Sequence, residues 1–412
     1  MEFAADFHIH SKYSRATSKD MDVEHLAYWA KLKGIQLIGT GDFTHYLWLE
    51  ELRSKLEDKG NGLYEYKGIN FILSSEISSI YSKNNRGHRI HNIIFAPSFK
   101  TVDKINAHLA GIGNLASDGR PILGLDAAEL ARIIFDIDEN CVLVPGHIWT
   151  PWFSLFGSMS GFNKIEDCFE EQTPKIFALE TGLSSDPGMN WRWSALDRFS
   201  LISNSDAHSP SKIGREANVF NCELSYPAIM EALRTKDKSK FLYTIEFYPE
   251  EGKYHYDGHR LCGTRFSPQE SRAHKNLCPK CGKPLTIGVM NRVDQLADRP
   301  EGFKPDNAIP FKNLIPLDEI VADVRGMGKA SKAVEQEYRG ILSKFGTEFE
   351  VLGKVPEEDL RKGMDPRIAE AIIRTRQGKV NIAPGYDGEY GKISIFGDDE
   401  KPKKHEEQLS LF

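Results

Sequence analysis

The stretch Asp6-Phe7-His8-Ile9-His10-Ser11 ends an apolar run that begins at Phe3. On an extended strand, side chains two positions apart point to the same face, so His8 and His10 can offer two imidazole nitrogens to one metal ion. An isolated His-x-His is a weak signal, because two surface histidines at a strand edge give the same pattern. Its meaning therefore depends on the residues at the ends of the other apolar runs of the chain.

The composition indicates a soluble globular protein of two or three domains. The 412 residues are 40% hydrophobic and 27% charged, and they contain no apolar stretch long enough to cross a bilayer. The N-terminus has no basic segment ahead of an apolar one, so we expect no signal peptide, and six cysteines in so long a chain favour a reducing cytoplasm. The net charge of −6 argues against indiscriminate nucleic-acid binding, so a DNA partner would need local basic patches or bound metal.

Seven apolar runs in about the first two hundred residues are predicted to be buried strands. Stretches of helical period lie between several of them, for example at 23–33 and 126–135. Strands that alternate with helices indicate an α/β fold with a parallel sheet, and seven or eight such units commonly close into a barrel. The seven runs are 3–9, 35–40, 69–74, 90–96, 141–145, 176–179 and 199–203.

Side chains of the kind that bind metal ions come directly after most of these runs. In a barrel, the carboxyl ends of the strands form the rim that carries active sites, so these side chains are expected to lie together. His91 lies near the start of its run and must point inward from the strand itself. A single His or Asp after a strand is more often a cap or turn residue, and we interpret His25, His88, His108 and His255 as surface or structural residues. The side chains expected at the rim are His8, His10, Asp42, Glu76, His147, Asp206 and His208.

Imidazoles and carboxylates gathered at one rim predict a metal centre. Ligands of this kind suit Zn²⁺, Mn²⁺ or Fe²⁺. A pair of such ions activates water near neutral pH and clamps both the attacking and the leaving oxygen of a phosphoester, so no nucleophilic Ser or Cys is needed. Cys141, Cys168 and Cys222 lie in or beside apolar segments and are interpreted as ordinary buried thiols.

The motifs DFHIHS (6–11), TGD (40–42), SSEIS (74–78), RIHN (89–92), PGH (145–147) and SDAHS (205–209) resemble, in order, those of the PHP metallo-phosphoesterases. The resemblance covers about the first 220 residues. It implies a distorted (β/α)7 barrel with two or three divalent ions, such as Zn²⁺, Mn²⁺ or Mg²⁺. The implied ligands are His8, His10 and Asp206 for one ion, Glu76 as the bridge, His91 and His147 for the second ion, and Asp42 and His208 for a third; His8, His10, Glu76 and Asp206 are predicted to be catalytic.

One position departs from the family pattern. Many PHP proteins have a histidine directly after the aspartate of the second strand, where this chain has Phe43. Either His45 replaces that histidine from further along the loop, or the third ion is weakly bound or absent.

A second metal site is predicted after residue 240. His259-x2-Cys262 and Cys278-x2-Cys281 form two knuckles fifteen residues apart, the arrangement of a Cys3His structural zinc site. Four protein ligands leave no open position, so such a module is usually a scaffold or a nucleic-acid contact. Two other histidines remain alternatives for the fourth ligand: His255 and His274.

Two loops dense in aromatic residues come after predicted strands, at 148–157 and 180–193. Aromatic side chains beside an active site stack on bases or wedge between them, and a hydrophobic lid over the barrel mouth is an equally good interpretation. The candidate substrate-binding residues are Trp149, Trp152, Asn190, Trp191 and Arg192.

The chain is predicted to have four parts. They are the barrel at 1–235, the zinc module at 240–295, a helical module at 296–385 that contacts DNA, and a flexible tail at 386–412. Helical patterns lie at 317–324, 333–345, 356–362 and 366–376, and Asp365-Pro366 is a typical helix start. Gly326-Met327-Gly328-Lys329 lacks the first glycine of a phosphate-binding loop, so no ATPase is predicted.

The last five residues are Gln408-Leu409-Ser410-Leu411-Phe412. This stretch looks like the bacterial sliding-clamp-binding pentapeptide, in which apolar side chains anchor in a hydrophobic cleft. The residues predicted to bind the clamp are Gln408, Leu409, Leu411 and Phe412.

Three longer stretches extend the resemblance to nearly the whole chain: GTGDF (39–43), ALETGLSSDPGMNWR (178–192) and YHYDGH…CPKCGKPLTIGV (254–289). They are similar to the endonuclease Q family within the PHP superfamily. The resemblance implies a DNA repair endonuclease for damaged double- or single-stranded DNA. It would cut on the 5′ side of a deaminated base (uracil, hypoxanthine or xanthine) or an abasic site, leaving 3′-hydroxyl and 5′-phosphate ends. The alternatives are a PHP-type phosphatase or 3′–5′ exonuclease, and a non-catalytic PHP scaffold recruited to the clamp.

Overall fold

The structure, a computed structural model, describes residues 2–397 and residue 400. It divides the chain into two compact units. The first unit comprises residues 2–314 together with 384–391, and the second comprises 315–383 together with 392–397 and residue 400. None of the described helices is long and apolar enough to cross a membrane. The predicted clamp-binding residues lie outside the described residues: Gln408, Leu409, Leu411 and Phe412.

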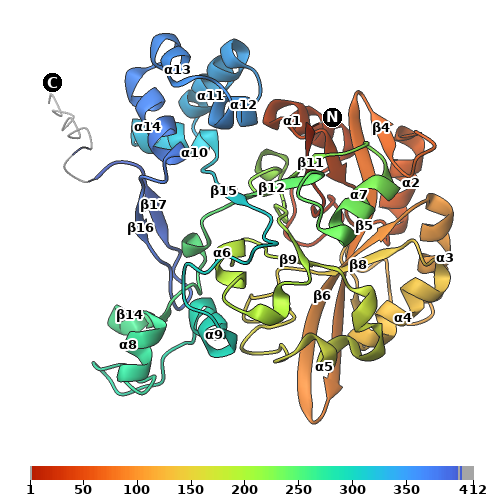
Figure 1. Cartoon of the computed structure of the whole chain (residues 1–412). Helices are drawn as coiled ribbons and strands as arrows, with labels where there is room; N and C mark the ends of the chain where they lie inside the picture. Colours follow the sequence, from red (N-terminus) through yellow and green to blue (C-terminus); the bar gives the residue numbers. More distant parts are fainter. Residues whose placement is uncertain (1, 398–399, 401–412) are drawn as a thin grey trace, which may run out of the picture. The chain divides into compact units, whose positions relative to one another are not determined.

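The first unit is built on a mixed β-sheet (Figure 1). Its strands are β1 (Glu2–Asp6), β2 (Leu37–Gly39), β3 (Glu57–Asp58), β4 (Tyr64–Tyr66), β5 (Ile69–Lys83), β6 (Arg86–Ala96), β7 (Ile122–Leu123), β8 (Val142–Pro145), β11 (Ala217–Asn221), β12 (Phe241–Glu246) and β15 (Phe311–Asn313). The order along the sheet is β15-β12-β11-β1-β2-β5-β4-β3; in addition, β6 pairs with β5 and β8, and β7 pairs with β5. A separate parallel pair consists of β9 (Ala178–Glu180) and β10 (Ser200–Ile202).

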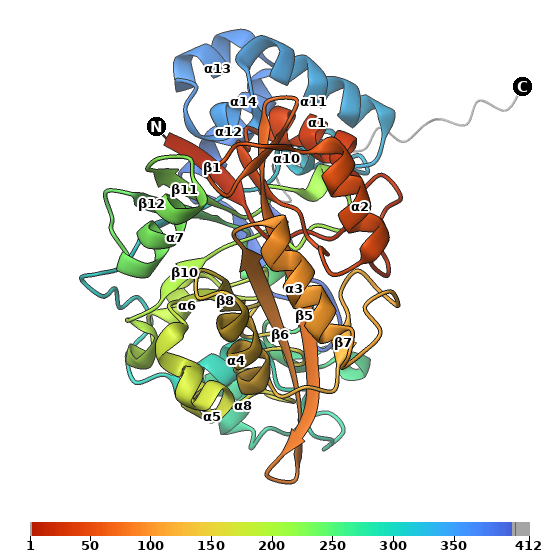
Figure 2. The same ribbon diagram turned by 90° about the vertical axis from the view of Figure 1, so that its right-hand side faces the viewer.

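All seven predicted strands are confirmed, as β1, β2, β5, β6, β8, β9 and β10. The prediction of a parallel sheet holds for β1, β2 and β5 and for the pair β9–β10, but it is wrong for β1–β11, β5–β6 and β6–β8, which are antiparallel. The physical reason at β5–β6 is the turn Asn84-Asn85, whose φ angles of 51° and 58° suit a two-residue hairpin, so no helical crossover separates these strands. Figure 2 shows the two strands side by side along this hairpin. The fold is therefore α/β with a mixed sheet, and the closed (β/α)7 barrel stays a prediction.

Helices come after several of these strands in the first unit. The predicted helices at 23–33 and 126–135 are confirmed as α1 (Val23–Lys33) and α4 (Ala127–Ile137). The carboxylate of Asp22 accepts the backbone N–H of His25 at the start of α1, and Gly34, at a φ of 88°, ends this helix. The other helices are α2 (Tyr46–Lys55), α3 (Phe99–Leu109), α5 (Ile165–Phe169), α6 (Pro187–Asn190) and α7 (Tyr226–Thr235), with short 3-10 helices at 170–175, 194–196, 210–212, 249–251 and 260–262.

A buried aromatic cluster supports the strand that leads to the first histidines. The rings of Phe3 and Phe220 lie 5.5 Å apart, those of Phe220 and Phe241 4.9 Å apart, and that of Phe7 lies 5.7 Å from Phe95. All five side chains are at most 2% exposed. Close packing of this kind leaves β1 little freedom, so the residues after it are held in place.

The Cys/His segment belongs to the first unit. Its elements are β13 (Asp257–His259), β14 (Thr264–Phe266), α8 (Pro268–Ala273) and α9 (Val289–Leu296). Arg292 of α9 donates to the backbone oxygens of Phe156 at 2.9 Å and Phe162 at 3.0 Å. These bonds tie the segment to the loop after β8.

The second unit is mainly helical, and the helical patterns predicted at 317–324, 333–345, 356–362 and 366–376 fall on its helices. It contains α10 (Leu317–Arg325), α11 (Lys332–Phe345), α12 (Glu348–Gly353), α13 (Glu357–Gly363) and α14 (Pro366–Arg376), and the antiparallel strands β16 (Asn381–Ala383) and β17 (Lys392–Ser394). At the predicted helix start, the carboxylate of Asp365 accepts the N–H groups of Arg367 and Ile368. Gly326, at a φ of 62°, ends α10, which explains the glycine of the Gly-Met-Gly stretch by helix termination alone.

Candidate metal centre

Imidazole and carboxylate side chains from distant parts of the chain converge at one place in the first unit. Among the described residues they form three groups, and the potential ligand atoms of each group lie within 4.8 Å of one another. The groups share His10 and Glu76 and are therefore one continuous cluster. They consist of His8, His10 and Glu76; of His10, Asp206 and His208; and of Glu76, His91 and His147.

Glu76 occupies the middle of this cluster. It lies within β5 and is 1% exposed. Its Oε1 is 2.6 Å from Nδ1 of His91 and 3.1 Å from Nε2 of His147, and its Oε2 is 3.3 Å from Nε2 of His10. His91 pairs with Ser78, two residues beyond Glu76, so the β5–β6 register places His91 and Glu76 on one face. A carboxylate that faces imidazoles with both oxygens has the position of a bridging ligand.

Unpartnered polar atoms show that the residues fit metal ions. Nε2 of His8, Nε2 of His10 and Oδ1 of Asp206 are buried, and none of them makes a hydrogen bond. Yet Nε2 of His10 lies only 3.0 Å from Oδ1 of Asp206, and Nε2 of His8 lies 3.6 Å from Oε2 of Glu76. Buried polar atoms that face one another without bonding are costly, and a cation between them removes that cost. Mixed imidazole and carboxylate donors suit Zn²⁺ or Mn²⁺.

Three residues of this region have unusual backbone conformations. Asp42, His147 and Asp206 have φ angles of 50°, 30° and 47°. Positive φ is unfavourable for residues other than glycine, and such strain collects at functional sites, where it aims a side chain that relaxed backbone would point elsewhere.

Two further carboxylates orient the first two histidines. Nδ1 of His8 donates to Oε1 of Glu180 at 3.0 Å, and Nδ1 of His10 donates to Oδ1 of Asp42 at 3.0 Å. With Nδ1 as the donor, the lone pair of each ring is on Nε2 and faces the cluster. Glu180 also accepts the backbone N–H of His147 at 2.7 Å, so it positions histidines from two strands.

The sequence-based reasoning missed Glu180. Glu180 follows the apolar run at 176–179 directly, whereas one serine, Ser75, separates Glu76 from the run at 69–74. Its place directly after a predicted strand is the feature by which the sequence could have indicated this residue.

Asp42 is predicted to be a metal ligand, but in the described structure it lies behind His10 and outside the three groups. Its second oxygen accepts Ser11 N–H at 2.6 Å, the Ser11 hydroxyl at 2.7 Å and the Ser14 hydroxyl at 2.8 Å. Both oxygens are thus occupied by hydrogen bonds. His45, the possible substitute at the third site, stacks on Tyr13 with ring centres 4.5 Å apart. Of the predicted third-site residues, His208 alone joins a group of the described residues.

Opposite charges stabilise one another within the cluster. Burial alone would lower the pKa of His8, but the charges of Glu180 and Glu76 raise it well above its usual value. Burial would raise the pKa of Glu76, but Arg120 and the surrounding imidazoles hold it well below its usual value. Burial lowers the pKa of His91 to about 4, so this ring is neutral and offers a lone pair. Metal ions therefore compete with protons at His8 and meet an ionised carboxylate at Glu76.

Arg120 is a second residue that the sequence-based reasoning missed. Its Nη1 lies 3.0 Å from Oε2 of Glu76, and its side chain is 25% exposed. The preceding Gly119 donates its N–H to Tyr13 O at 3.1 Å, and a Cβ on Gly119 would lie 2.3 Å from Oδ2 of Asp42. Glycine is thus required for the close approach that brings the guanidinium to the edge of the metal centre. Arg120 lies at the end of none of the seven apolar runs, so no strand-end pattern points to it.

Four of the five predicted substrate-binding residues are packed against protein. Trp149 and Asn190 are fully buried, and the Trp149 indole N–H donates to Oδ1 of Asn190 at 2.7 Å. Arg192 is paired with Asp294 at 2.5 Å. Trp191 lies against Phe311, with ring centres 5.4 Å apart. The Trp149–Asn190 bond joins the two aromatic loops, and Arg192 and Trp191 attach the second loop to α9 and β15.

Trp152, the fifth of these residues, is 37% exposed and lines a cavity of about 460 Å³. The other residues around the cavity include Arg89, Phe153, Tyr254 and His255. The Phe153 ring is 4.9 Å from that of His91, so the cavity adjoins the metal centre. An aromatic-walled space of this kind can accept a planar ring.

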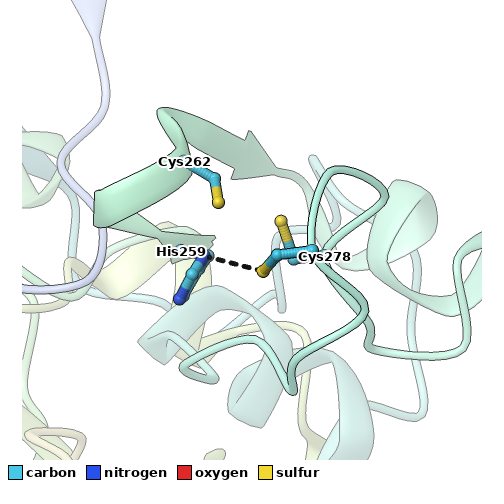
Figure 3. Close-up of side chains that lie close together, drawn as sticks. His259, Cys262 and Cys278 are labelled. Carbon is cyan, nitrogen blue, oxygen red and sulfur yellow. Dashed lines mark hydrogen bonds between the residues drawn. The ribbon is translucent and has the colours of Figure 1, made fainter.

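The predicted Cys3His cluster is present. Ligand atoms of His259, Cys262, Cys278 and Cys281 lie within 4.8 Å of one another, and Nδ1 of His259 is 3.5 Å from Sγ of Cys281. Figure 3 shows the side chains of His259, Cys262 and Cys278 turned toward one another. The Thr264 hydroxyl, with a smaller contribution from backbone N–H groups of the knuckle, lowers the pKa of Cys278 to about 6, which favours the thiolate that binds metal. The alternative fourth ligand His274 stacks on Phe266, with ring centres 4.7 Å apart, and His255 lines the cavity beside Trp152.

Comparison with known proteins identifies relatives along the whole chain. Residues 316–379 match the family model of the MJ0043 C-terminal domain. An uncharacterized protein of Methanocaldococcus jannaschii, MJ0043, is 35% identical over 284 residues, which are 65% of this chain and 34% of that protein. The chain thus spans about a third of the length of MJ0043. The uncharacterized protein YqxK of Bacillus subtilis is 30% identical over 409 residues, which are 94% of this chain and 98% of that protein.

Two solved structures are similar over almost their full length. The lesion-specific endonuclease PfuEndoQ of Pyrococcus furiosus superposes with a TM-score of 0.87 at 34% identity, covering 98% of each chain. Endonuclease Q in complex with a 27-mer duplex that carries an abasic lesion at the active site superposes with a TM-score of 0.86 at 34% identity, covering 98% of this chain and 99% of that one. The chain therefore belongs to the endonuclease Q family of DNA-cleaving hydrolases.

Proposed function

We propose that this protein is a metal-dependent DNA repair endonuclease. It hydrolyses the phosphodiester on the 5′ side of a deaminated base (uracil, hypoxanthine or xanthine) or of an abasic site. The observation that carries the proposal is the convergence of buried, unpartnered imidazole and carboxylate atoms around Glu76. The full-length similarity to a lesion-specific endonuclease and to a complex with an abasic duplex supports the choice of substrate.

In this proposal the cluster holds two or three divalent ions, Zn²⁺, Mn²⁺ or Mg²⁺. His8, His10 and Asp206 would hold one ion, His91 and His147 would hold the second, Glu76 would be shared between the two, and His208 would contribute to a third. When bound, such ions lower the pKa of water and offset the charge that develops on a phosphodiester. Glu180 and Asp42 act through the histidines, because they fix the ring orientation that presents Nε2.

Arg120 is the cationic group of the chain itself that would meet the scissile phosphate. Its guanidinium reaches the edge of the cluster and is partly exposed, so a phosphate oxygen can approach it. A guanidinium holds phosphate oxygens through two parallel N–H donors. The charge of Glu76 raises the pKa of Arg120 by more than burial lowers it, so the group stays charged at any working pH.

The cavity lined by Trp152 accepts the damaged nucleotide in this proposal. Taking a base out of a duplex costs a few kcal/mol, and less where pairing is already poor, as in U·G or I·T. The aromatic rings of Trp152, Phe153 and Tyr254 offer stacking surface, and Arg89 adds a positive charge beside them. Trp149, Asn190, Trp191 and Arg192 then support the walls and need not touch the base.

Several parts of the proposal rest on the sequence. We propose Zn²⁺ as the ion of the Cys3His cluster, a distorted barrel as the arrangement of the strands, and the cytoplasm as the location. We also propose that the zinc module at 240–295 and the helical module at 296–385 both contact DNA. The residues Gln408, Leu409, Leu411 and Phe412 would bind a sliding clamp of the bacterial type.

The test is to incubate the protein with end-labelled duplexes that carry uracil, hypoxanthine or an abasic site, in Mn²⁺ and in Mg²⁺. We expect one nick on the 5′ side of each lesion, with 3′-hydroxyl and 5′-phosphate ends, and no cleavage of undamaged duplex. A ladder of fragments shortened from the 3′ end would identify an exonuclease instead. Hydrolysis of a phosphate monoester without nicking would identify a phosphatase. If the metal-loaded protein cleaved neither the duplexes nor the monoester, the protein would be a non-catalytic scaffold.

A further inference from the structure

Positive charge is concentrated in the Cys/His segment. Residues 253–285 contain seven lysines and arginines and two acidic residues, a net charge of +5, in a chain whose net charge is −6. All seven basic residues are exposed, whereas Asp257 is buried and accepts hydrogen bonds from Gly288 and Asn291. Residues 315–383, by contrast, contain twelve residues of each sign. The charge of this segment therefore complements a phosphate backbone better than that of the helical second unit.

The tip of the first knuckle exposes a leucine. Leu261 is 84% exposed, more than any other large hydrophobic side chain in the described part of the chain. It lies in the turn between His259 and Cys262, two residues of the Cys3His cluster, so the cluster fixes its backbone from both sides. Nζ of Lys280 donates to Cys262 O at 2.6 Å and joins the second knuckle to this turn. An apolar side chain on a rigid, basic turn is the kind of group that proteins insert between base steps.

Two basic residues beside this leucine are available for phosphates. Arg260 precedes Leu261, and Lys283 ends the second knuckle; both are exposed, and neither forms an ion pair within the residues that the structure describes. Arg272 differs, because it is paired with Asp294. Unpaired cations lose no protein contact when they meet a phosphate.

The segment is attached beside the metal centre. Tyr254 and His255, at its base, line the same cavity of about 460 Å³ as Phe153. Phe153 in turn contacts the metal centre through His91, whose N–H donates to Phe153 O at 3.3 Å. A nucleotide that enters this cavity therefore has its neighbouring base pairs next to the segment.

We propose that the face formed by Arg260, Leu261 and Lys283 is a duplex-binding surface. Arg260 and Lys283 hold backbone phosphates on either side of the knuckle, and Leu261 inserts into the base stack beside the nucleotide that leaves the helix. The inference rests on the proposed endonuclease function. It adds that Leu261 contributes to cleavage of double-stranded substrates more than to cleavage of single-stranded ones. A single strand has no stack to open, so Leu261 contributes little to its cleavage.

Two variants test the surface in the full-length, zinc-loaded protein. For Leu261→Ser, we expect cleavage of a uracil-containing duplex to fall about tenfold, because the opened base stack loses the side chain that fills it, while cleavage of the same strand without its complement is unchanged. For Arg260→Ala/Lys283→Ala, we expect weaker duplex binding and a slope of log K against log salt reduced by about 2, since each lost phosphate contact removes about 0.9. Lys280 is left in place because it joins the knuckles.

Matched controls separate this surface from general surface effects. Leu47→Ser replaces another exposed leucine, and Lys31→Ala/Lys104→Ala removes two exposed lysines of helices α1 and α3. Both controls should behave like the wild type, and measured zinc content should be the same in every variant.

The outcomes distinguish the two levels of the proposal. Failure of the wild type to cut either substrate would contradict the proposed function itself. A wild type that cuts both, with Leu261→Ser keeping the same duplex-to-single-strand ratio and the double variant keeping the same salt slope, overturns the surface alone. That second result would also be the one expected if the face bound a protein partner.

Discussion

The two clusters of potential metal ligands in this protein are built in different ways. The Cys3His cluster takes its residues from two neighbouring knuckles and leaves Cys281 exposed, whereas the other cluster joins His8 to His208 across the first unit and buries Glu76. Four ligands from neighbouring knuckles can come together by local folding, and because they leave no open coordination position, such a set is typical of a structural metal site. A set that shares a carboxylate and borders an arginine and a cavity needs the whole sheet, and such a set serves chemistry.

The surroundings of the two clusters differ in the same way. Behind His8 and His10 are the carboxylates of Glu180 and Asp42, held in a buried network. Beside Cys278 are the Thr264 hydroxyl and backbone N–H groups of its own knuckle. Side chains that act through a ligand are therefore expected to matter far more at the first cluster than at the second.

The largest expected effect separates the two clusters directly. His8→Ala should lower cleavage of single-stranded uracil DNA by about a thousandfold or more, because a ligand of the catalytic ions is lost, while zinc at the Cys3His cluster remains. Cys281→Ser should lose that zinc and lower the unfolding temperature, yet retain most of this cleavage. Initial rates, metal content and thermal unfolding measure the three quantities.

Circular dichroism of His8→Ala serves as the folding control for this pair. The comparison fails if the cysteine variant loses cleavage and the histidine variant keeps it.

An intermediate effect is expected for the residues behind the histidines. Glu180→Gln keeps a hydrogen-bond acceptor for His8 but removes the charge, and we expect a loss of about 10- to 100-fold in metal affinity, with a matching loss in activity that added metal partly restores. Thr264→Val is the matched change at the other cluster and should alter zinc affinity less. Metal titration followed by calorimetry measures both affinities. Equal losses at the two clusters would show that the surroundings of the first one are not special.

The smallest expected effect is a pH dependence confined to the first cluster's surroundings. Burial raises the pKa of Glu246 to about 8, although the hydroxyls of Ser203 and Thr244 donate to it. In the unfolded chain this carboxyl has an ordinary pKa near 4.5, so between about pH 4.5 and 8 the folded protein holds a proton that the unfolded chain has lost. The free energy of unfolding therefore falls as pH rises through this window.

Glu246→Gln removes that proton exchange. We expect the unfolding temperature of this variant to fall less between pH 5 and pH 8 than that of the wild type, and Glu139→Gln, a change at an exposed carboxylate, to leave the wild-type profile intact. Parallel profiles for the wild type and Glu246→Gln would mean that the carboxyl is already ionised in the folded protein.

Much of the metal centre could be predicted because its residues come after recognisable runs. His8, His10, Glu76, His147 and Asp206 each lie at or beyond the end of an apolar run, and a strand end is readable from composition alone. The sequence could not predict the hydrogen bonds of Asp42, because only packing brings its carboxylate against His10, Ser11 and Ser14. It could not predict Arg120 either, since that side chain arrives on a loop whose path depends on Gly119 lying against Asp42.

For the aromatic loops, too, the sequence could not predict which side chains are accessible to a substrate. Trp149 and Trp152 are three residues apart and look alike in sequence, yet one is fully buried and the other lines the cavity. Which of them is accessible depends on Asn190, which is distant in sequence and accepts the Trp149 indole N–H.

Seven of the strands, several helices and the paired knuckles could be predicted from the sequence, because each depends on the spacing of a few neighbouring residues. Only the tertiary fold shows which carboxylates face the imidazole cluster, which orient its histidines, and that an arginine and an aromatic cavity border it. Those outcomes depend on the directions of side chains that lie far apart in the chain, and close packing of the sheet sets these directions.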